Sequence, residues 1–295
     1  MKYLEEFLNF LKFEKQYSFH TYQAYLIDLN QFAEFCQNNY HISEPEEINH
    51  KLIRKWIVSL IEENITARSI NRKLSALKSF YRFLLKKGLL DHNPLDKVVA
   101  PKIKKRLPVF VEEKHMNNLL DDIDFGNDFL GVRNKLIIEM FYYTGIRLSE
   151  LINLKDLDVD IQGLTIKVLG KRKKERIIPI INGFALEINN YRKIRSNDIG
   201  IQSCEYFFIN KKGEKLYPEY VYRTIRKFLQ LVTTIDKKSP HILRHTFATH
   251  LLNKGADLNA IKELLGHANL SATEVYTHNS FEKLTRIYKQ AHPRS

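Results

Sequence analysis

The segment from His241 to Tyr276 reads HILRHTFATHLLNKGADLNAIKELLGHANLSATEVY. Its apolar spacing predicts helical structure, and Gly266 is expected to follow a helix end, where positive φ is favoured. Ser271 to Glu274 fits a capping box that begins a short helix carrying Tyr276. Imidazoles and a guanidinium that precede a phenol favour a site at which tyrosine attacks a phosphodiester.

His241 and Arg244 lie three residues apart, so they share one face of a helix and can address one phosphate. Arg244 presents a planar fork of donors to phosphate oxygens and stays charged at any working pH. His241 can accept or release a proton near neutral pH. Taken alone, this spacing is common in surface or structural helices, so the surrounding motifs decide its meaning.

His245 and His250 belong to the same expected helix, and two imidazoles on one helix face can bind zinc. However, no glutamate follows the first histidine and no third ligand is evident. We therefore expect no metal and no other cofactor, and we predict that His245 supports the catalytic groups or the core.

The motif Thr144-Gly145-Ile146-Arg147 predicts a tight turn at Gly145, with Arg147 at the start of the next helix. Glu150 lies one helical turn later, so its carboxylate can hold the guanidinium of Arg147 in place. The alternative is a simple ion pair on a helix surface.

The 295 residues suit one large or two modest domains and carry a net charge of +13. A field of this sign attracts polyanions, which favours a nucleic-acid partner. Cys36 and Cys204 lack CxxC spacing and are predicted to be reduced thiols. The charged N-terminus has no secretory pattern and no apolar run approaches membrane-spanning length, so we expect a cytoplasmic protein without membrane contact.

Residues 1–88 contain apolar stripes at helical spacing and are predicted to form a bundle of four helices. One helix is expected to start at Ser18, and the last to start near Thr66 and stop before Gly88. Residues 89–108 contain three prolines and a run of cations, which predicts a basic linker. A linker that wraps DNA is favoured over one that is merely solvated.

Residues 109–295 are predicted to form a mixed α/β domain, so the whole chain is mostly α with a small β-sheet. The β-rich runs Leu164 to Leu169 and Arg176 to Ile181 flank GKRKKE, which predicts a hairpin with a cationic tip. Glu205 to Ile209 is expected to add a third strand.

These motifs together resemble the tyrosine recombinase family. The resemblance covers nearly the whole chain, and it is closest to the Xer-type recombinases because of the ending HPRS and the compact length. The motif residues occur in the family's order, and they are Arg147 in TGIRLSEL, Lys171 in VLGKRKKERIIP, His241 and Arg244 in HILRH, His267 in LLGH and Tyr276 in VYTH.

The resemblance implies that Tyr276 attacks phosphorus and forms a 3′-phosphotyrosine linkage. Arg147 and Arg244 are expected to stabilise charge on the non-bridging oxygens, and the resemblance adds a hydrogen bond from His267. His241 is the candidate base or proton relay.

Lys171 is the candidate acid for the leaving 5′-hydroxyl, although the tip sequence KRKK leaves open which lysine acts. The linkage preserves bond energy, so strand exchange through a Holliday junction is expected to need neither ATP nor metal.

The family likeness also implies that the N-terminal bundle is half of a C-shaped clamp on double-stranded DNA. Its fourth helix carries five cations that are expected to contact mostly phosphates, with Arg72 or Lys73 reaching base edges; they are Arg68, Arg72, Lys73, Lys78 and Arg82. A solvated outer face is the alternative.

Similar recombinases act as homo- or hetero-tetramers on DNA with a related recombinase, and a DNA translocase as activator is also implied. The amphipathic tail from Asn279 to Ser295 is expected to pack on a neighbouring subunit, or alternatively on its own domain. The leading interpretation is Xer-type resolution of chromosome dimers in chromosome partition. A mobile-element integrase, a type IB topoisomerase and a DNA-binding regulator without catalysis are the alternatives.

Overall fold

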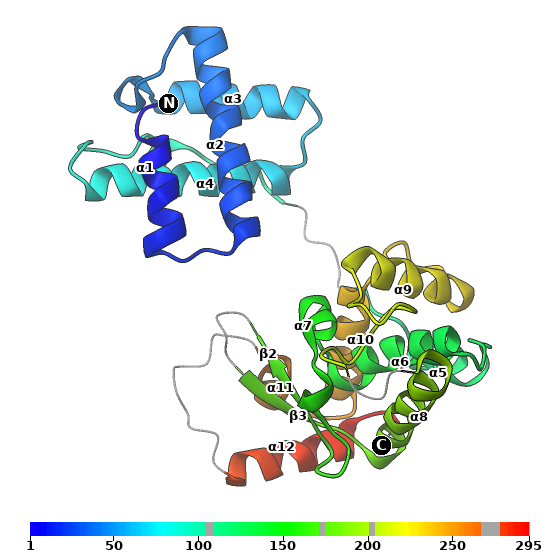
Figure 1. Cartoon of the computed structure of the whole chain (residues 1–295). Helices are drawn as coiled ribbons and strands as arrows, with labels where there is room; N and C mark the ends of the chain where they lie inside the picture. The colour runs from blue at the N-terminus through cyan, green and yellow to red at the C-terminus, as the bar shows by residue number, and fades with distance from the viewer. Residues whose placement is uncertain (104–108, 171–174, 201–203, 267–277, 295) are drawn as a thin grey trace. The chain divides into compact units, whose positions relative to one another are not determined.

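The computed structural model describes residues 1–103, 109–170, 175–200, 204–266 and 278–294 (Figure 1). The chain divides into two compact units, Met1–Arg106 and Leu107–Ser295. The expected fold class, mostly α with a small β-sheet, is confirmed. The domain limits at 88 and 108 and the C-shaped clamp stay predictions.

The first unit is the predicted bundle of four helices. Its elements are α1 (Leu4–Asn9) with a π-helical turn at Phe10–Glu14, α2 (Phe19–Tyr40), α3 (His50–Glu62) and α4 (Ala67–Lys86). The side chains of Ser18 and Thr66 accept hydrogen bonds from the main-chain nitrogens of Thr21 and Ser69, so both expected helix starts are confirmed. Because α4 ends at Lys86, its predicted stop before Gly88 is also confirmed.

Aromatic side chains hold the first unit together. The rings of Phe32 and Trp56 lie 4.7 Å apart, and Phe7 makes an edge contact with Phe80 at 5.4 Å. All four side chains are buried. Burial of each such ring contributes roughly 1.5–3 kcal/mol, so these contacts hold α2 against α3 and α1 against α4.

The second unit surrounds the long buried helix α6. Its helices are α5 (Glu113–Asp121), α6 (Phe129–Thr144), α7 (Leu148–Asn153), α8 (Asn182–Ile199), α9 (Pro218–Val232), α10 (Pro240–Asn253), α11 (Leu258–Leu265) and α12 (His278–Ala291). Helices α8 and α10 pack against α6, and most residues from Leu136 to Thr144 are buried. A helix that is apolar on all sides forms the centre of a core. In the described part of the chain, no helix has the length and apolarity to span a membrane.

The sheet is antiparallel, with the order β1 (Val159–Asp160), β2 (Thr165–Leu169) and β3 (Glu175–Pro179). The predicted antiparallel pairing of the two β-rich runs is therefore confirmed, with Val168 opposite Arg176, while the cationic tip at 171–174 lies outside the described residues. Side chains on β3 alternate, so Arg176 and Ile178 face the interior.

The expectation of a third strand at Glu205 to Ile209 is wrong. The third strand is β1, and residues 205–209 make only isolated bridges, such as Lys155 with Tyr206. Phe207, Phe208 and Ile209 are all buried, whereas a strand with one covered face would alternate. The segment is an inward-facing loop.

The described part of the C-terminal tail packs on its own domain, against α10, α11 and β3. The Tyr288 hydroxyl donates a hydrogen bond to the main-chain oxygen of Tyr143 at 2.9 Å. Arg294 binds the carboxylate of Asp121 with both terminal nitrogens, at 2.9 and 2.6 Å. These contacts match the second of the two placements expected for the tail.

Candidate active site

Two arginines from distant parts of the chain meet at the end of α11. Arg244, on α10, donates hydrogen bonds to the carbonyl oxygen of Gly145 and, at 2.6 Å, to that of Leu265. Arg147, directly before α7, donates at 2.9 Å to the carbonyl oxygen of Gly266. Because Leu265 and Gly266 are neighbours, both guanidinium groups face the same turn of the chain.

Two glycines make this approach sterically feasible. Gly145 has φ +58° at the end of α6, and a Cβ there would lie 2.5 Å from the Phe247 ring. Gly266 has φ +64° at the end of α11, and a Cβ would lie 3.1 Å from Arg176. The expected turn at Gly145 and helix end at Gly266 are both present.

Glu150 holds Arg147 at the start of α7. One carboxylate oxygen accepts from Arg147 Nη1 at 2.7 Å, and the other accepts from the Arg147 main-chain nitrogen at 2.8 Å. This ion pair between Arg147 and Glu150 is the contact that their spacing in the sequence predicted. Because Glu150 is buried while Arg147 remains partly exposed, the guanidinium is fixed at its base and open to a ligand.

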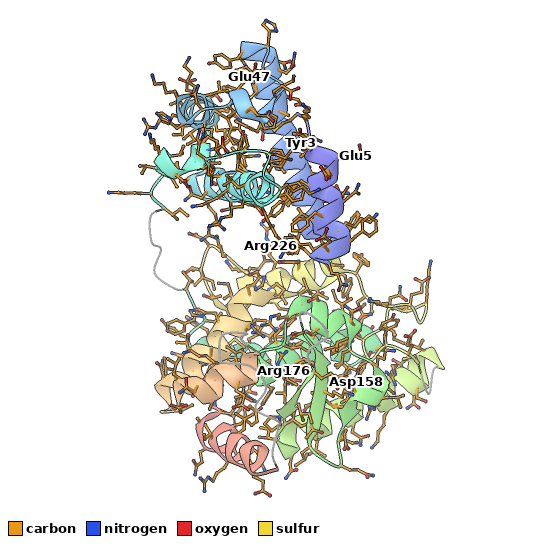
Figure 2. The ribbon with its side chains drawn as sticks, turned by 90° about the vertical axis from the view of Figure 1, so that its left-hand side faces the viewer. Tyr3, Glu5, Glu47, Asp158, Arg176 and Arg226 are labelled. Atoms are coloured by element: carbon orange, nitrogen blue, oxygen red, sulfur yellow. The ribbon has the colours of Figure 1, made fainter. Side chains whose placement is uncertain are left out.

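Arg176 completes the cluster, and the sequence interpretation missed it (Figure 2). It lies on β3 and binds both oxygens of Glu150, each at 2.8 Å. A usable signal was present in the strand pattern. Arg176 occupies an inward position two residues before Ile178, and a cation at such a position needs a buried partner.

The cluster keeps an excess of positive charge, since three guanidinium groups surround one carboxylate. Burial acts to raise the pKa of Glu150, but the hydrogen bonds and charge of Arg176 and the hydrogen bonds from Arg147 outweigh it and lower that pKa to about 2. Burial, together with the charges of Arg147 and Arg176, lowers the pKa of Arg244 to about 9. Both groups are therefore ionised at neutral pH, and the cluster suits an anion.

His241, Arg244 and His245 line one groove between α10 and α11, with a volume of about 420 Å³. His241 is exposed and His245 is half-buried. The structure thus brings both histidines to the same side of α10 as Arg244.

The idea that His245 and His250 share a helix face is wrong. They are five residues apart, which corresponds to a rotation of roughly 140° around an α-helix. His250 is buried, and its Nδ1 lies 3.0 Å from the hydroxyl oxygen of Tyr142. His250 is therefore a core residue.

Three of the predicted catalytic residues, Lys171, His267 and Tyr276, lie outside the described residues, as does the capping box at 271–274. His267 follows Gly266 directly in sequence, and Lys171 follows Gly170, which ends the described part of the hairpin after β2.

The predicted DNA-contacting helix α4 divides into two kinds of residue. Four of its cations are exposed: Arg68, Arg72, Lys78 and Arg82. Lys73 is only 7% exposed and donates to Asp28 at 3.1 Å and to Gln31. Lys73 therefore faces the interior and is not part of the exposed basic face of α4, unlike the predicted role for it.

Arg72 is tied to the same carboxylate, at 2.5 Å from Asp28 Oδ2. Its side chain remains half exposed and lines a groove of about 410 Å³ between α2 and α4. A second exposed basic face, which the sequence interpretation did not single out, lies on α9 and includes Arg223, Arg226 and Lys227.

Comparison with known proteins identifies the family. The phage integrase family profile matches residues 109–283, and the profile of the N-terminal SAM-like domain of phage integrases matches residues 4–88. The chain belongs to the phage integrase family. It is 36% identical over 319 residues to tyrosine recombinase XerC of Chlorobaculum tepidum, which covers 100% of this chain and 95% of that protein.

A second curated relative and a solved structure agree with this family assignment. Tyrosine recombinase XerC of Bacillus licheniformis is 39% identical over 298 residues, covering 99% of this chain and 97% of the relative. Among solved structures, a post-cleavage complex of XerH site-specific recombinase with a palindromic difH substrate matches with TM-score 0.69 and 22% identity, over 93% of this chain and 77% of XerH. The resemblance to tyrosine recombinases, closest to the Xer type, is confirmed, and the XerH match supports the fold.

Proposed function

We propose that the protein is a site-specific tyrosine recombinase that cuts and rejoins double-stranded DNA through a 3′-phosphotyrosine intermediate. One observation carries the proposal. Arg147 and Arg244 converge on the carbonyl oxygens of Gly266 and Leu265, immediately before residue 267 in the chain. Full-length relatives named tyrosine recombinase support the same conclusion.

The arginines stabilise the charge that develops on the scissile phosphate. A phosphodiester repels nucleophiles because it is anionic, and its transition state gathers further charge on the non-bridging oxygens. Guanidinium groups held in advance by Glu150 and by main-chain carbonyls need little reorganisation when that charge appears. His267, the next residue after Gly266, adds a hydrogen bond to the same phosphate.

Two residues other than the paired arginines, His241 and Lys171, carry out proton transfer. The phenol of Tyr276, with an ordinary pKa of about 10, needs a partner that accepts its proton. His241 is exposed in the groove that Arg244 also lines, so it is the candidate base. Lys171, on the hairpin that links β2 and β3, protonates the leaving 5′-oxygen. A 5′-hydroxyl from a second duplex then reverses the reaction and releases Tyr276.

DNA binding involves both units and the basic segment 89–108 between them. The exposed cations of α4, namely Arg68, Arg72, Lys78 and Arg82, and the basic face of α9 contact mainly phosphates. We assign residues 1–88 to DNA binding and 109–295 to catalysis.

The biological role that we propose is Xer-type resolution of chromosome dimers in the cytoplasm, by a homo- or hetero-tetramer on DNA, with a DNA translocase as the candidate activator. The XerC names of relatives at 36–39% identity over nearly their full length favour this role. A mobile-element integrase is the alternative, since it would use the same residues.

Covalent capture tests the proposal and identifies the DNA site in one experiment. The protein is incubated with genomic DNA and quenched with denaturant, and the attached DNA is sequenced. A plasmid carrying two copies of the recovered site should then yield deletion products. Supercoil relaxation without deletion would indicate a type IB topoisomerase, and DNA binding without any adduct would indicate a regulator. A recovered site at the chromosomal terminus would favour dimer resolution over element integration.

A further inference from the structure

The end of α11 is held by three arginines in succession. The carbonyl oxygen of Leu264 accepts from Arg176 Nε at 2.8 Å. The next two carbonyl oxygens, of Leu265 and Gly266, accept from Arg244 and Arg147. The last carbonyls of a helix lack partners within the helix, so a guanidinium at each one fixes where the chain leaves α11.

Arg176 binds a second group at the same time. Its two terminal nitrogens pair with the two oxygens of Glu150, and each of these oxygens also accepts a hydrogen bond from Arg147. The paired forks of Arg176 and Glu150 have the bidentate geometry that restricts orientation most strongly. Arg176 therefore sets the position of the Glu150 carboxylate, and that carboxylate in turn orients Arg147.

The Arg176 side chain is only 6% exposed, and all three of its nitrogens are engaged with protein atoms. It is thus unsuited to touch substrate. On β3, Arg176 lies opposite Val168, one residue pair from the end of the ladder that leads into residues 170–174, so this one side chain connects that end of the strand pair with α7 and α11.

We propose that Arg176 is a positioning residue for strand cleavage, which orients Arg147 and the end of α11 toward the scissile phosphate. The inference rests on the proposed recombinase function. Removal of Arg176 leaves Glu150 buried with half of its partners, so Glu150 draws Arg147 inward and the phosphate loses part of its positive surroundings. The main-chain pairing of β2 with β3 does not depend on this side chain, so delivery of the proton to the leaving group is affected less.

The test compares three versions of one nicked substrate in single-turnover cleavage. One has a normal scissile phosphate, one a methylphosphonate that lacks the negative charge, and one a 5′-bridging sulfur that leaves without a proton. Arg176→Lys should slow cleavage of the normal substrate by about 100-fold, the loss typical of one misplaced transition-state donor. The defect should shrink to about 10-fold or less on the methylphosphonate and persist with the sulfur leaving group.

Arg195→Lys is the matched control, because Arg195, on α8, is also buried and pairs with Asp156 at 3.2 Å. It should lower thermal stability without changing the ratio of the rates on normal and methylphosphonate DNA. If Arg176→Lys does not fold, the double variant Arg176→Gln with Glu150→Gln removes both buried charges; it leaves Arg147 without the carboxylate that orients it, so its cleavage defect should likewise shrink on the methylphosphonate.

An equal loss on all three substrates would overturn the inference, because that result indicates a structural role alone. A defect that disappears only with the sulfur leaving group would also overturn it and would assign Arg176 to the proton donor. If the unaltered protein itself formed no adduct, the recombinase proposal would fail instead, which keeps the two failures distinct.

Discussion

The carbonyl oxygen of Gly145 accepts a hydrogen bond from Arg244, a residue 99 positions later in the chain. The bond joins α10 to the turn between α6 and α7, two residues before Arg147. It therefore ties one candidate phosphate-binding arginine to the main chain that positions the other. The relative position of Arg147 and Arg244 therefore depends on Gly145, where only a residue without a side chain fits beside Phe247.

Gly145→Ala should damage both stability and cleavage. The new Cβ would lie 2.5 Å from the Phe247 ring, and the alanine would also have to adopt φ +58°. We expect a loss of about 1 kcal/mol from the backbone conformation and a further ~1–3 kcal/mol from overpacking, as measured by denaturant unfolding. Strand cleavage should fall as well, because the carbonyl that Arg244 binds must shift.

Gly200→Ala provides the control for this substitution. Gly200 ends α8 with φ +72°, and a Cβ there meets nothing within 4 Å among the described residues. It should show the backbone loss alone and cleave at the normal rate. Equal stability losses at the two glycines would contradict the packing argument.

Lys73→Met and Lys78→Met should separate interior from DNA-facing cations on one helix. Lys73 neutralises buried Asp28, so its loss should reduce the free energy of unfolding by up to roughly 3–5 kcal/mol, with Arg72 softening the effect. Lys78 is exposed, so its loss should leave stability unchanged. For Lys78→Met the slope of log binding constant against log salt should fall by about 0.9, the value for one phosphate contact. An unchanged slope would remove Lys78 from the DNA-contacting set.

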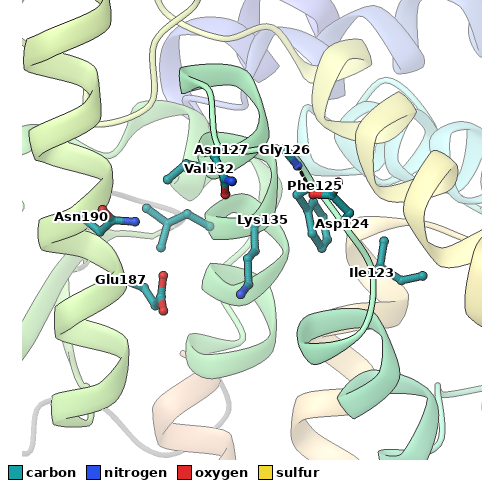
Figure 3. Close-up of a pocket in the computed structure, with 10 residues that line it drawn as sticks. Ile123, Asp124, Phe125, Gly126, Asn127, Val132, Lys135, Glu187 and Asn190 are labelled. Atoms are coloured by element: carbon teal, nitrogen blue, oxygen red, sulfur yellow. Dashed lines mark hydrogen bonds between the residues drawn. The ribbon is translucent and has the colours of Figure 1, made fainter.

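Glu139 predicts a pH dependence of stability. Burial raises its pKa to about 7, and its neighbours include Lys135, Glu187, Asp121 and Arg294. Lys135 and Glu187 face one pocket from α6 and α8 (Figure 3). Oε2 of Glu139 has no hydrogen-bond partner among the described residues. The folded state therefore favours the protonated acid.

A raised carboxyl pKa means that the unfolded chain releases this proton at lower pH than the folded protein. The resulting destabilisation is absent well below pH 4.5, grows as the pH rises, and is complete above about pH 7, where it amounts to at most about 3 kcal/mol. The difference in melting temperature between Glu139→Gln and the unaltered protein should therefore shift in favour of the variant between pH 4.5 and pH 8. A stability difference that stays constant across this range would show that Glu139 ionises normally.

Much of the fold could be predicted from periodicity and caps, as at Ser18, Thr66 and the hairpin of β2 and β3. Those signals are local, since each depends on residues a few positions apart. The function of Arg176 depends on Glu150 and Leu264, which lie 26 and 88 positions away. No local pattern pairs such residues.

Lys73 illustrates the same limit within one helix. Its spacing from Arg72 and Lys78 is compatible with a basic face, but its burial is decided by Asp28 on α2, 45 positions earlier. A helix pattern gives the direction of each side chain but not what the next helix places opposite it. The segment Phe207 to Ile209 shows a similar limit. Three consecutive apolar residues suit either a strand or a buried loop. Main-chain hydrogen bonds to distant residues, such as that from the Phe207 nitrogen to the Leu154 oxygen, decide between the two.

The most direct test of the account is to identify the residue that becomes linked to DNA. The protein is trapped on a nicked suicide substrate, the complex is digested with protease and nuclease, and the modified peptide is sequenced by mass spectrometry. The account predicts a nucleotide on Tyr276 through a 3′-phosphate, formed about 100- to 1,000-fold more slowly by Arg147→Lys or Arg244→Lys. Tyr276→Phe should bind the same DNA without attachment. A nucleotide on any other side chain, or an adduct formed by Tyr276→Phe, would contradict the account.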